Sequence, residues 1–141
     1  MSRRTTVRAL QSVLAGEHAA VYGYGVLGAH LSGPARRRAL SAYDAHRARR
    51  DELAALIRAQ HAEPVAAAAS YALPAPVATA LDAVGLATLL EERLAAVWAD
   101  AVADLTGDLR ALAVRGLRDA AVRATRWRGA SVPFPGLPER S

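Results

Sequence analysis

Cysteine, lysine and asparagine are absent from the 141-residue chain, and aromatic residues make up only 5% of it. Without cysteine, the chain can form no disulfide, thiolate nucleophile or Cys-ligated zinc site. So few aromatic side chains argue against a β-sandwich or β-barrel, whose strands favour them. No apolar run approaches the ~20 residues of a membrane-spanning helix, and no signal-peptide pattern follows the N-terminal arginines. We therefore expect a cytoplasmic protein with no membrane partner.

Alanine and arginine dominate what is present. The apolar fraction is 52%, and because every basic residue except histidine is arginine, the net charge is +5. Alanine is the best helix former, and its small side chain lets helices approach closely. The arginine content has two explanations, the coding bias of a GC-rich genome or a selected anion-binding surface. We favour coding bias.

The spacing of apolar residues predicts four helices in a single domain that covers residues 1–141. We expect them at about residues 5–31, 34–61, 76–105 and 107–127, followed by an extended, proline-containing tail over 129–141. Ser32-Gly33-Pro34 and Thr106-Gly107-Asp108 supply the first and last breaks between helices. Gly23, Gly25 and Gly28 in the first helix suggest that another helix, from this chain or a second copy, approaches closely there.

The connection between the second and third helices is long. Residues 62–75 include Pro64 and Pro74, and proline and the residue before it favour extended backbone. Fourteen extended residues can span up to ~50 Å, whereas a 27-residue helix is only ~40 Å long. The connection can therefore run the length of a bundle, which would make the second and third helices parallel, as in ferritin-like folds.

Two acids interrupt otherwise apolar helical stripes. Glu17 has Tyr24 seven residues on, and Glu91 has Trp98 seven residues on, so each pair shares one helix face. A buried carboxylate needs a proton, a cation or a metal. Continuing the stripes brings cationic side chains inward from the second and fourth helices. The predicted buried polar centre therefore comprises Glu17, Tyr24, His46, Arg50, Glu91, Glu92 and Arg123, with Glu92 as the alternative to Glu91.

Several sequence segments, taken together, resemble those of a known protein family, and the resemblance covers nearly the whole chain. They are AGEHAAVYGYGVLGA, HRARRDEL, YALPAPV, LEER with Trp98, and RATRWRG with the FPGLPE tail. In combination they resemble the uncharacterised alanine- and arginine-rich ferritin-like domains of GC-rich bacteria. The resemblance implies an all-α, ferritin-like four-helix bundle, and it implies no particular activity.

A ferritin-like di-iron site takes a Glu from each of two helices and a Glu-x-x-His from each of the other two. Glu17, His46 and Glu91 match part of this pattern, but Tyr43 stands three residues before His46. The fourth helix offers only Asp119 between residues 109 and 127, and no histidine. We favour a centre without cofactor, in which Arg50 and Arg123 neutralise the acids. The alternative is a single iron or manganese ion on Glu17, His46 and Glu91.

Three functions remain open. We favour a structural or interaction module that self-associates, most simply as a dimer, and has no enzymatic activity. The second is a metal-binding, oxidoreductase-like protein with a degenerate carboxylate and histidine site. The third is a basic DNA-binding bundle, against which we count the spread of arginines over all helices and the interleaved acids. No motif of a hydrolase or of a phosphate-binding loop is present.

Overall fold

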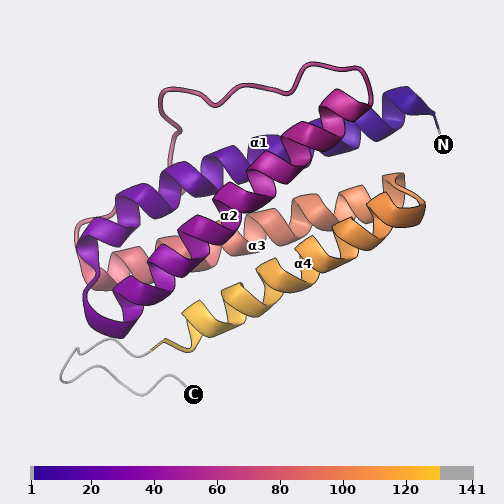
Figure 1. Ribbon diagram of the computed structural model, residues 1–141. Coiled ribbons are helices and arrows are strands. Elements are labelled where there is room, and N and C mark those ends of the chain that lie inside the picture. The colour runs from indigo at the N-terminus through magenta and orange to yellow at the C-terminus, as the bar shows by residue number, and fades with distance from the viewer. Residues whose placement is uncertain (1, 131–141) are drawn as a thin grey trace.

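The computed structural model describes residues 2–130, and these form four α-helices and no strand (Figure 1). The helices are α1 (Arg3–Leu27), α2 (Gly33–Ala59), α3 (Ala80–Asp104) and α4 (Gly107–Arg128), and a short 3₁₀ turn, η1 (Gly28–His30), follows α1. The predicted all-α fold is confirmed. None of the described helices is both long enough and apolar enough to cross a membrane. The predicted extended tail lies, from residue 131 onward, outside the described residues.

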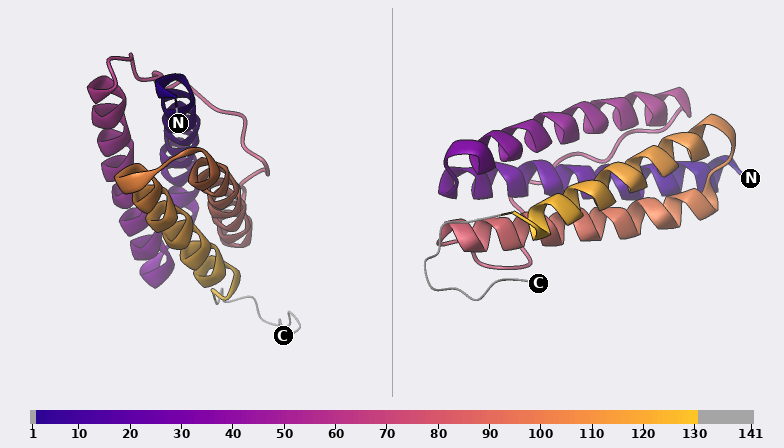
Figure 2. Two further views of the ribbon diagram at one scale, coloured as in Figure 1. Left: turned by 90° about the vertical axis from the view of Figure 1, so that its right-hand side faces the viewer. Right: turned by 90° about the horizontal axis from the view of Figure 1, so that it is seen from below.

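The four helices form a bundle in which α2 and α3 run parallel. In Figure 1, α1 runs away from the N-terminus, α2 returns, and the connection of residues 60–79 travels back along the molecule before α3 begins. The two views of Figure 2 show the same arrangement from the side and from below. The long crossover predicted from Pro64 and Pro74 is therefore present.

The crossover is held against α1 by polar side chains spaced along that helix. Gln11 donates to the carbonyl of Glu63 at 2.7 Å and accepts from the backbone N–H of Val65 at 2.8 Å. Arg3 donates to the carbonyl of Gln60 at 2.7 Å. Because this segment has no helical bonds of its own, these bonds satisfy backbone groups that would otherwise depend on water.

Two helix ends differ by four residues from the sequence expectation. α1 ends at Leu27, and the 3₁₀ turn occupies residues that we had expected to be α-helical. α3 begins at Ala80 instead of residue 76, because Thr79 and Asp82 form a capping box. The Thr79 hydroxyl accepts from the Asp82 N–H at 3.0 Å, and the Asp82 carboxylate accepts from the Thr79 N–H at 3.2 Å. Reciprocal capping of this kind fixes where a helix starts.

The core follows the predicted stripes closely on α1 and less closely on α2. The apolar residues that repeat with the helical period along α1, including Leu10, Val13 and Leu27, are all buried. On α2, Leu40 is 51% exposed, and Ala39 and Ala42 face inward in its place. The smaller side chains face inward because α2 comes close to the rest of the bundle there.

The helices pack unevenly. Gly116 of α4 lies against the Trp98 indole of α3 so closely that a Cβ at this position would overlap the ring, and Gly23 of α1 lies equally close to Leu90 of α3. In contrast, no Cα of α2 lies within 8 Å of a Cα of α4 among the described residues. The bundle is therefore tight around α3 and open between α2 and α4.

Candidate functional site

Two acidic side chains face each other across the middle of the bundle. Glu17 comes from the centre of α1 and Glu91 from the centre of α3, and their exposed fractions are 2% and 0%. Both helices bury an apolar stripe on either side of the acid, so neither carboxylate can turn to solvent without unpacking the helix. A carboxylate in such a position needs a cationic or hydrogen-bonding partner.

His46 of α2 is that partner for both acids. Its Nδ1 lies 2.5 Å from Oε1 of Glu17, and its Nε2 lies 2.8 Å from Oε2 of Glu91. An ionised carboxylate only accepts hydrogen bonds, so between two such groups both ring nitrogens donate and the ring is an imidazolium. Two carboxylates and one imidazolium leave the centre with one net negative charge.

The protonation of His46 is set by two opposing effects. Burial by itself lowers the pKa of His46, because a charged ring loses its hydration. The hydrogen bonds and negative charges of Glu17 and Glu91 outweigh burial and raise this pKa from 6.5 to about 9. At neutral pH the ring is therefore charged, in agreement with the two short contacts to carboxylates.

Aromatic side chains extend the hydrogen-bond chain in both directions. The Tyr24 hydroxyl donates to Oε2 of Glu91 at 2.5 Å, and the Trp127 indole N–H donates to that hydroxyl at 2.9 Å. On the other side, the Trp98 indole N–H donates to Oε2 of Glu17 at 3.3 Å. The chain of contacts thus runs through side chains from all four helices.

Tyr24 stays protonated within this chain. Burial, followed by the charge of Glu91 and the hydrogen bond to it, raises the pKa of Tyr24 far above its usual value near 10, and the Trp127 hydrogen bond and the charge of Arg123 only partly oppose this. The Tyr24 ring also stacks on His46, with centroids 5.4 Å apart. Tyr24 is therefore a fixed hydrogen-bond donor to Glu91 at every physiological pH.

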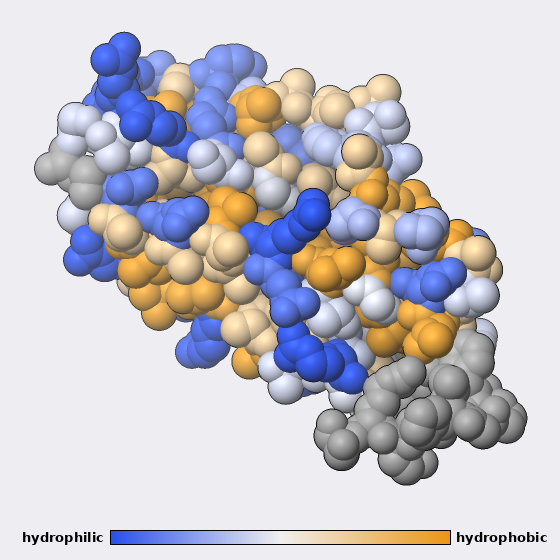
Figure 3. Space-filling model, turned by 180° about the vertical axis from the view of Figure 1, so that it is seen from behind, coloured by the Kyte–Doolittle hydropathy of each residue, from blue (hydrophilic) through white to orange (hydrophobic). Residues whose placement is uncertain are grey.

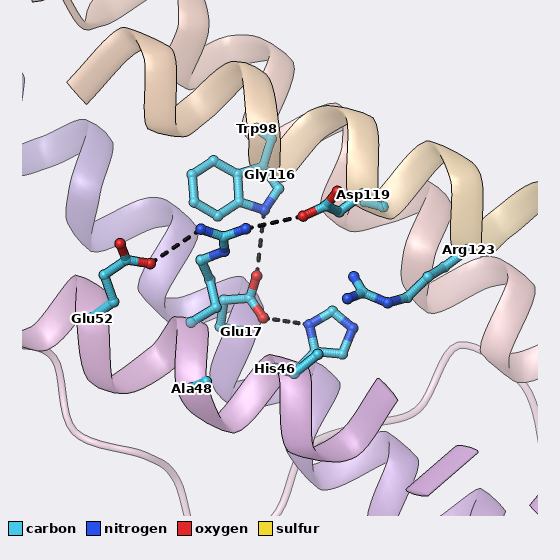
Figure 4. A pocket seen from close by; sticks show the side chains of 11 residues that line it. Glu17, His46, Ala48, Glu52, Trp98, Gly116, Asp119 and Arg123 are labelled. Carbon is cyan, nitrogen blue, oxygen red and sulfur yellow. Dashed lines mark hydrogen bonds and ion pairs between the residues drawn. The ribbon is translucent and has the colours of Figure 1, made fainter. Parts of the chain in front are cut away.

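A cleft between α2 and α4 leads from the surface to this centre (Figure 4). Its volume is about 280 Å³, with Glu17, His46 and Trp98 at its inner end. Arg49 crosses the cleft, and its guanidinium contacts Glu52 on its own helix and Asp119 on α4, both at 3.1 Å. The same guanidinium lies over the Trp98 ring, 5.6 Å from its centroid. Arg49 therefore joins two helices whose backbones do not approach each other.

Arg123 lines the same cleft from α4. In Figure 4 its guanidinium points toward His46, and among residues 2–130 it makes no hydrogen bond or ion pair. Oε1 of Glu91 is buried and has no hydrogen-bond partner among the described residues. Within the described residues, the buried group of Glu17, His46 and Glu91 therefore keeps one net negative charge. The Arg123 guanidinium lies close to this charge without forming an ion pair with it.

Four of the seven predicted centre residues come together. Glu17, Tyr24, His46 and Glu91 form the buried chain. Arg50 lies away from it and contacts Asp51 at 3.0 Å. Glu92 is 48% exposed and contacts Arg128 at 2.8 Å. We expected Arg50 and Arg123 to neutralise the two acids. Within residues 2–130 this expectation is wrong, because the cation that contacts both carboxylates is His46.

The donors at the centre do not fit the di-metal site of a ferritin-like oxidase. Only Glu17, His46 and Glu91 are available, and each ring nitrogen of His46 is taken by a different carboxylate. A di-metal site would need further metal ligands from α4, but the side chain that α4 places in the cleft beside Glu17 and His46 is Arg123. Within residues 2–130, no group of three or more histidine and acidic side chains is placed to hold a metal ion. We derive no metal chemistry from this centre.

Arg49 is the site residue that the sequence interpretation missed. The predicted polar centre included its neighbour Arg50 instead. The spacing of Arg49 was informative, because a residue three positions after His46 lies on the same face of the helix, one turn on. The role of the two indole N–H groups was also missed, since a tryptophan on an apolar stripe gives no sign of its hydrogen-bond partner.

Comparison with known proteins places this geometry in a family. The model of a domain of unknown function, DUF4439, matches residues 9–139. A conserved hypothetical protein, Rv2844, from Mycobacterium tuberculosis has 38% sequence identity and a TM-score of 0.85, with 91% of this chain and 98% of that chain covered. No functionally curated protein matches the chain.

Two further solved structures are similar in fold at 16% sequence identity. One is a ferritin-like, diiron-carboxylate protein from Bacillus anthracis str. Ames, with a TM-score of 0.78 and coverage of 91% of this chain and 97% of that chain. The other is a dodecameric thioferritin, the bacterioferritin-related protein from Bacteroides fragilis, with a TM-score of 0.75 and coverage of 91% and 84%. At this identity the likeness establishes the ferritin-like bundle alone.

Proposed function

This chain belongs to the DUF4439 family, and on that premise we propose that it is a cytoplasmic structural or interaction domain in which a histidine takes the place of the metal ions of a ferritin-like centre. The observation that carries the proposal is His46, which contacts Glu17 and Glu91 at 2.5 and 2.8 Å. An imidazolium supplies the positive charge that two facing carboxylates require. A cofactor is then not needed to hold the helices together.

Such a centre suits a role in specifying the fold. A buried ion pair adds little stability over a well-packed apolar core, but it penalises any packing that separates the partners. Here the partners come from three helices, so a shift of α1, α2 or α3 along its axis would leave a carboxylate buried without a cation. The centre therefore supports one register of the bundle.

The metal content of the purified protein tests this proposal against the iron- or manganese-binding alternative. We expect protein expressed with added iron and manganese, and purified without chelator, to contain far less than one metal ion per chain by plasma mass spectrometry. Stoichiometric metal that is lost in both Glu17→Ala and His46→Ala would establish the oxidoreductase-like alternative instead. Glu92→Ala is the matched control, because this acid adjoins Glu91 but lies at the surface.

The domain is also proposed to self-associate through its α1–α3 side. A groove of about 700 Å³ between these helices is lined mainly by small side chains, including Ala9, Ser12 and Ala15. Seen from behind, the surface shows orange apolar areas separated by blue hydrophilic groups (Figure 3). Of the glycines that suggested close approach, Gly23 is used inside the bundle, whereas Gly28 has open space where its Cβ would be. A homodimer is the simplest assembly that covers this side.

A further inference from the structure

The positive charge of the protein is concentrated on two of its four helices. α2 carries seven arginines against three acids, and α4 carries six arginines against two acids, so the two together have a net charge of +8. α1 and α3 together carry four arginines against six acids, a net charge of −2. Coding bias raises the arginine content of a whole chain, but it does not select helices. The distribution therefore points to a function of the α2–α4 face, by which we mean the exposed side chains of these two helices.

The two basic helices lie on the same side of the bundle. In Figure 1 α2 lies in front of α1 and α4 lies in front of α3, and the cleft of Figure 4 separates α2 from α4. All four helices carry arginine, as we expected when we counted this spread against nucleic-acid binding, but α2 and α4 hold 13 of the 17 arginines of the described chain. The two helices that carry most of the arginines are therefore the two that border the cleft.

Many arginines on this face are free to bind an external anion. Among the described residues, Arg36, Arg37, Arg58, Arg115 and Arg126 are exposed and make no ion pair. The other arginines of the face include those already engaged with Asp51, Asp119 and Glu92. Free guanidinium groups repel one another, and an anion that contacts several of them at once relieves this repulsion.

The free arginines gather most densely where α2 begins and α4 ends. Arg38 and Arg126 line one hollow of about 640 Å³, and Arg36 and Arg37 stand on the adjoining turn of α2. Arg38 also lies over the Trp127 ring at 5.6 Å from its centroid, which holds this side chain in place. An arginine can donate two parallel hydrogen bonds to one phosphate group, which lysine cannot do.

We propose that the α2–α4 face binds the phosphate backbone of double-stranded DNA. A 27-residue helix is ~40 Å long, and duplex DNA presents about one negative charge per 1.7 Å of its axis. Two arginine-rich helices of this length therefore carry guanidinium groups over a distance that spans many phosphates of a duplex. The inference concerns the outer face and does not depend on the protonation or metal content of the buried centre.

Two other polyanions fit the face less well. Single-stranded nucleic acid is held by stacking on exposed aromatic rings, and the exposed large apolar side chains of the described chain are all aliphatic. An anionic membrane surface favours a helix with Trp, Phe and Leu opposite the charges. On α2 and α4, only Leu40, Val114 and Val122 are large, apolar and exposed. Duplex DNA requires only charge, spacing and hydrogen-bond donors, all of which the face supplies.

The proposal is tested by fluorescence anisotropy with a labelled 20-base-pair duplex between 50 and 200 mM NaCl. We expect the full-length protein to bind with a steep salt dependence. In R36Q/R37Q/R126Q, affinity should fall at least tenfold at 100 mM salt, and the slope of log K against log salt should become shallower by about 2.7, since each lost phosphate contact removes ~0.9. This triple variant leaves Arg38 on Trp127 and should keep the wild-type circular dichroism spectrum.

The matched control is R4Q/R8Q/R93Q, which removes the same charge from α1 and α3. We expect its affinity and salt slope to remain within about twofold of the wild-type values. If the control weakens binding as much as the α2–α4 variant, only net charge matters and the proposal is wrong. It is also wrong if the wild type does not bind the duplex at 50 mM salt. Tighter binding to phosphatidylserine vesicles or to a single strand at the same salt would overturn it equally.

Discussion

At the scale of the residue, His46 connects the buried polar side chains of the described core to one another. It holds Glu17 and Glu91, and it stacks on Tyr24. Removing one member of such a buried set leaves an uncompensated charge, which is far more costly than never having formed the set. The stability of the protein should therefore depend on the charge of this single ring.

The pH dependence of unfolding reports that charge. His46 has a pKa of about 9 in the folded protein and an ordinary value of 6.5. A raised folded-state pKa gives stabilisation that is complete below pH 6.5 and is lost as the pH rises through 9. We expect the free energy of unfolding, measured with urea and circular dichroism, to fall by about 3 kcal/mol over that window.

A matched pair of variants separates His46 from the other histidines. In His46→Gln the decline between pH 6.5 and 9 should disappear, and the protein should be less stable at pH 6 by about 3 kcal/mol or more. His18→Gln is the control, because the hydrogen bond of His18 to the carbonyl of Val65 lies near the surface, away from the buried centre. An unchanged pH slope in His46→Gln would show that the ring is not the titrating group.

The sequence revealed these residues only in part. Glu17 and Glu91 were found because an acid on an apolar stripe is conspicuous, and the stripe of α2 brought His46 to the same level. Which cation reaches the acids was not predictable, since it depends on the distance of α2 from α1 and α3. An arginine at position 50 is one turn further along α2, and in the structure it contacts Asp51 instead.

At the scale of the element, helix existence was easier to predict than helix ends. All four helices and the crossover followed from apolar period and proline placement. The start of α3 was predicted four residues too early. Val77 continues the apolar period of α3, but the capping box of Thr79 and Asp82 sets the first helical residue at Ala80. Periodicity indicates which face is buried, whereas a hydrogen-bonded cap decides where a helix begins.

The caps of α3 and α4 provide a comparison within one protein. Both helices begin after a threonine, but only Thr79 accepts a side-chain hydrogen bond, and Thr106 makes none. Thr79→Ala should therefore lower the free energy of unfolding by about 1 kcal/mol, as for other lost N-caps. Thr106→Ala should lower it by less than about half as much. Equal losses in urea unfolding would mean that the capping box contributes nothing beyond helix propensity.

At the scale of the whole molecule, the bundle has two unlike sides. The α2–α4 side is strongly positive, and two copies of it would repel each other. The α1–α3 side is nearly neutral and rich in small side chains, so it is the side on which copies of this chain can meet. Neither property was visible in the sequence, because the assignment of charge to a side requires the packing order of the helices.

Light scattering coupled to gel filtration checks the proposed dimer. We expect the wild type to have about twice the 14.8 kDa mass of the chain. Ala15→Arg, which places a charge in the α1–α3 groove, should give a mass close to that of one chain. Ala111→Arg on the exposed surface of α4 is the control and should remain dimeric. A wild-type mass of one chain at high protein concentration would contradict the assembly.

The two tryptophans have a consequence for observing the protein in solution. The sequence contains only Trp98 and Trp127, and their indole N–H groups hold the two ends of the same buried hydrogen-bond chain. An arginine of α2 covers each ring, Arg49 the first and Arg38 the second. Indole emission is sensitive to the charge and hydrogen bonding around the ring. The tryptophan fluorescence of the unmodified protein therefore reports on the buried hydrogen-bond chain, because the sequence has no other tryptophan.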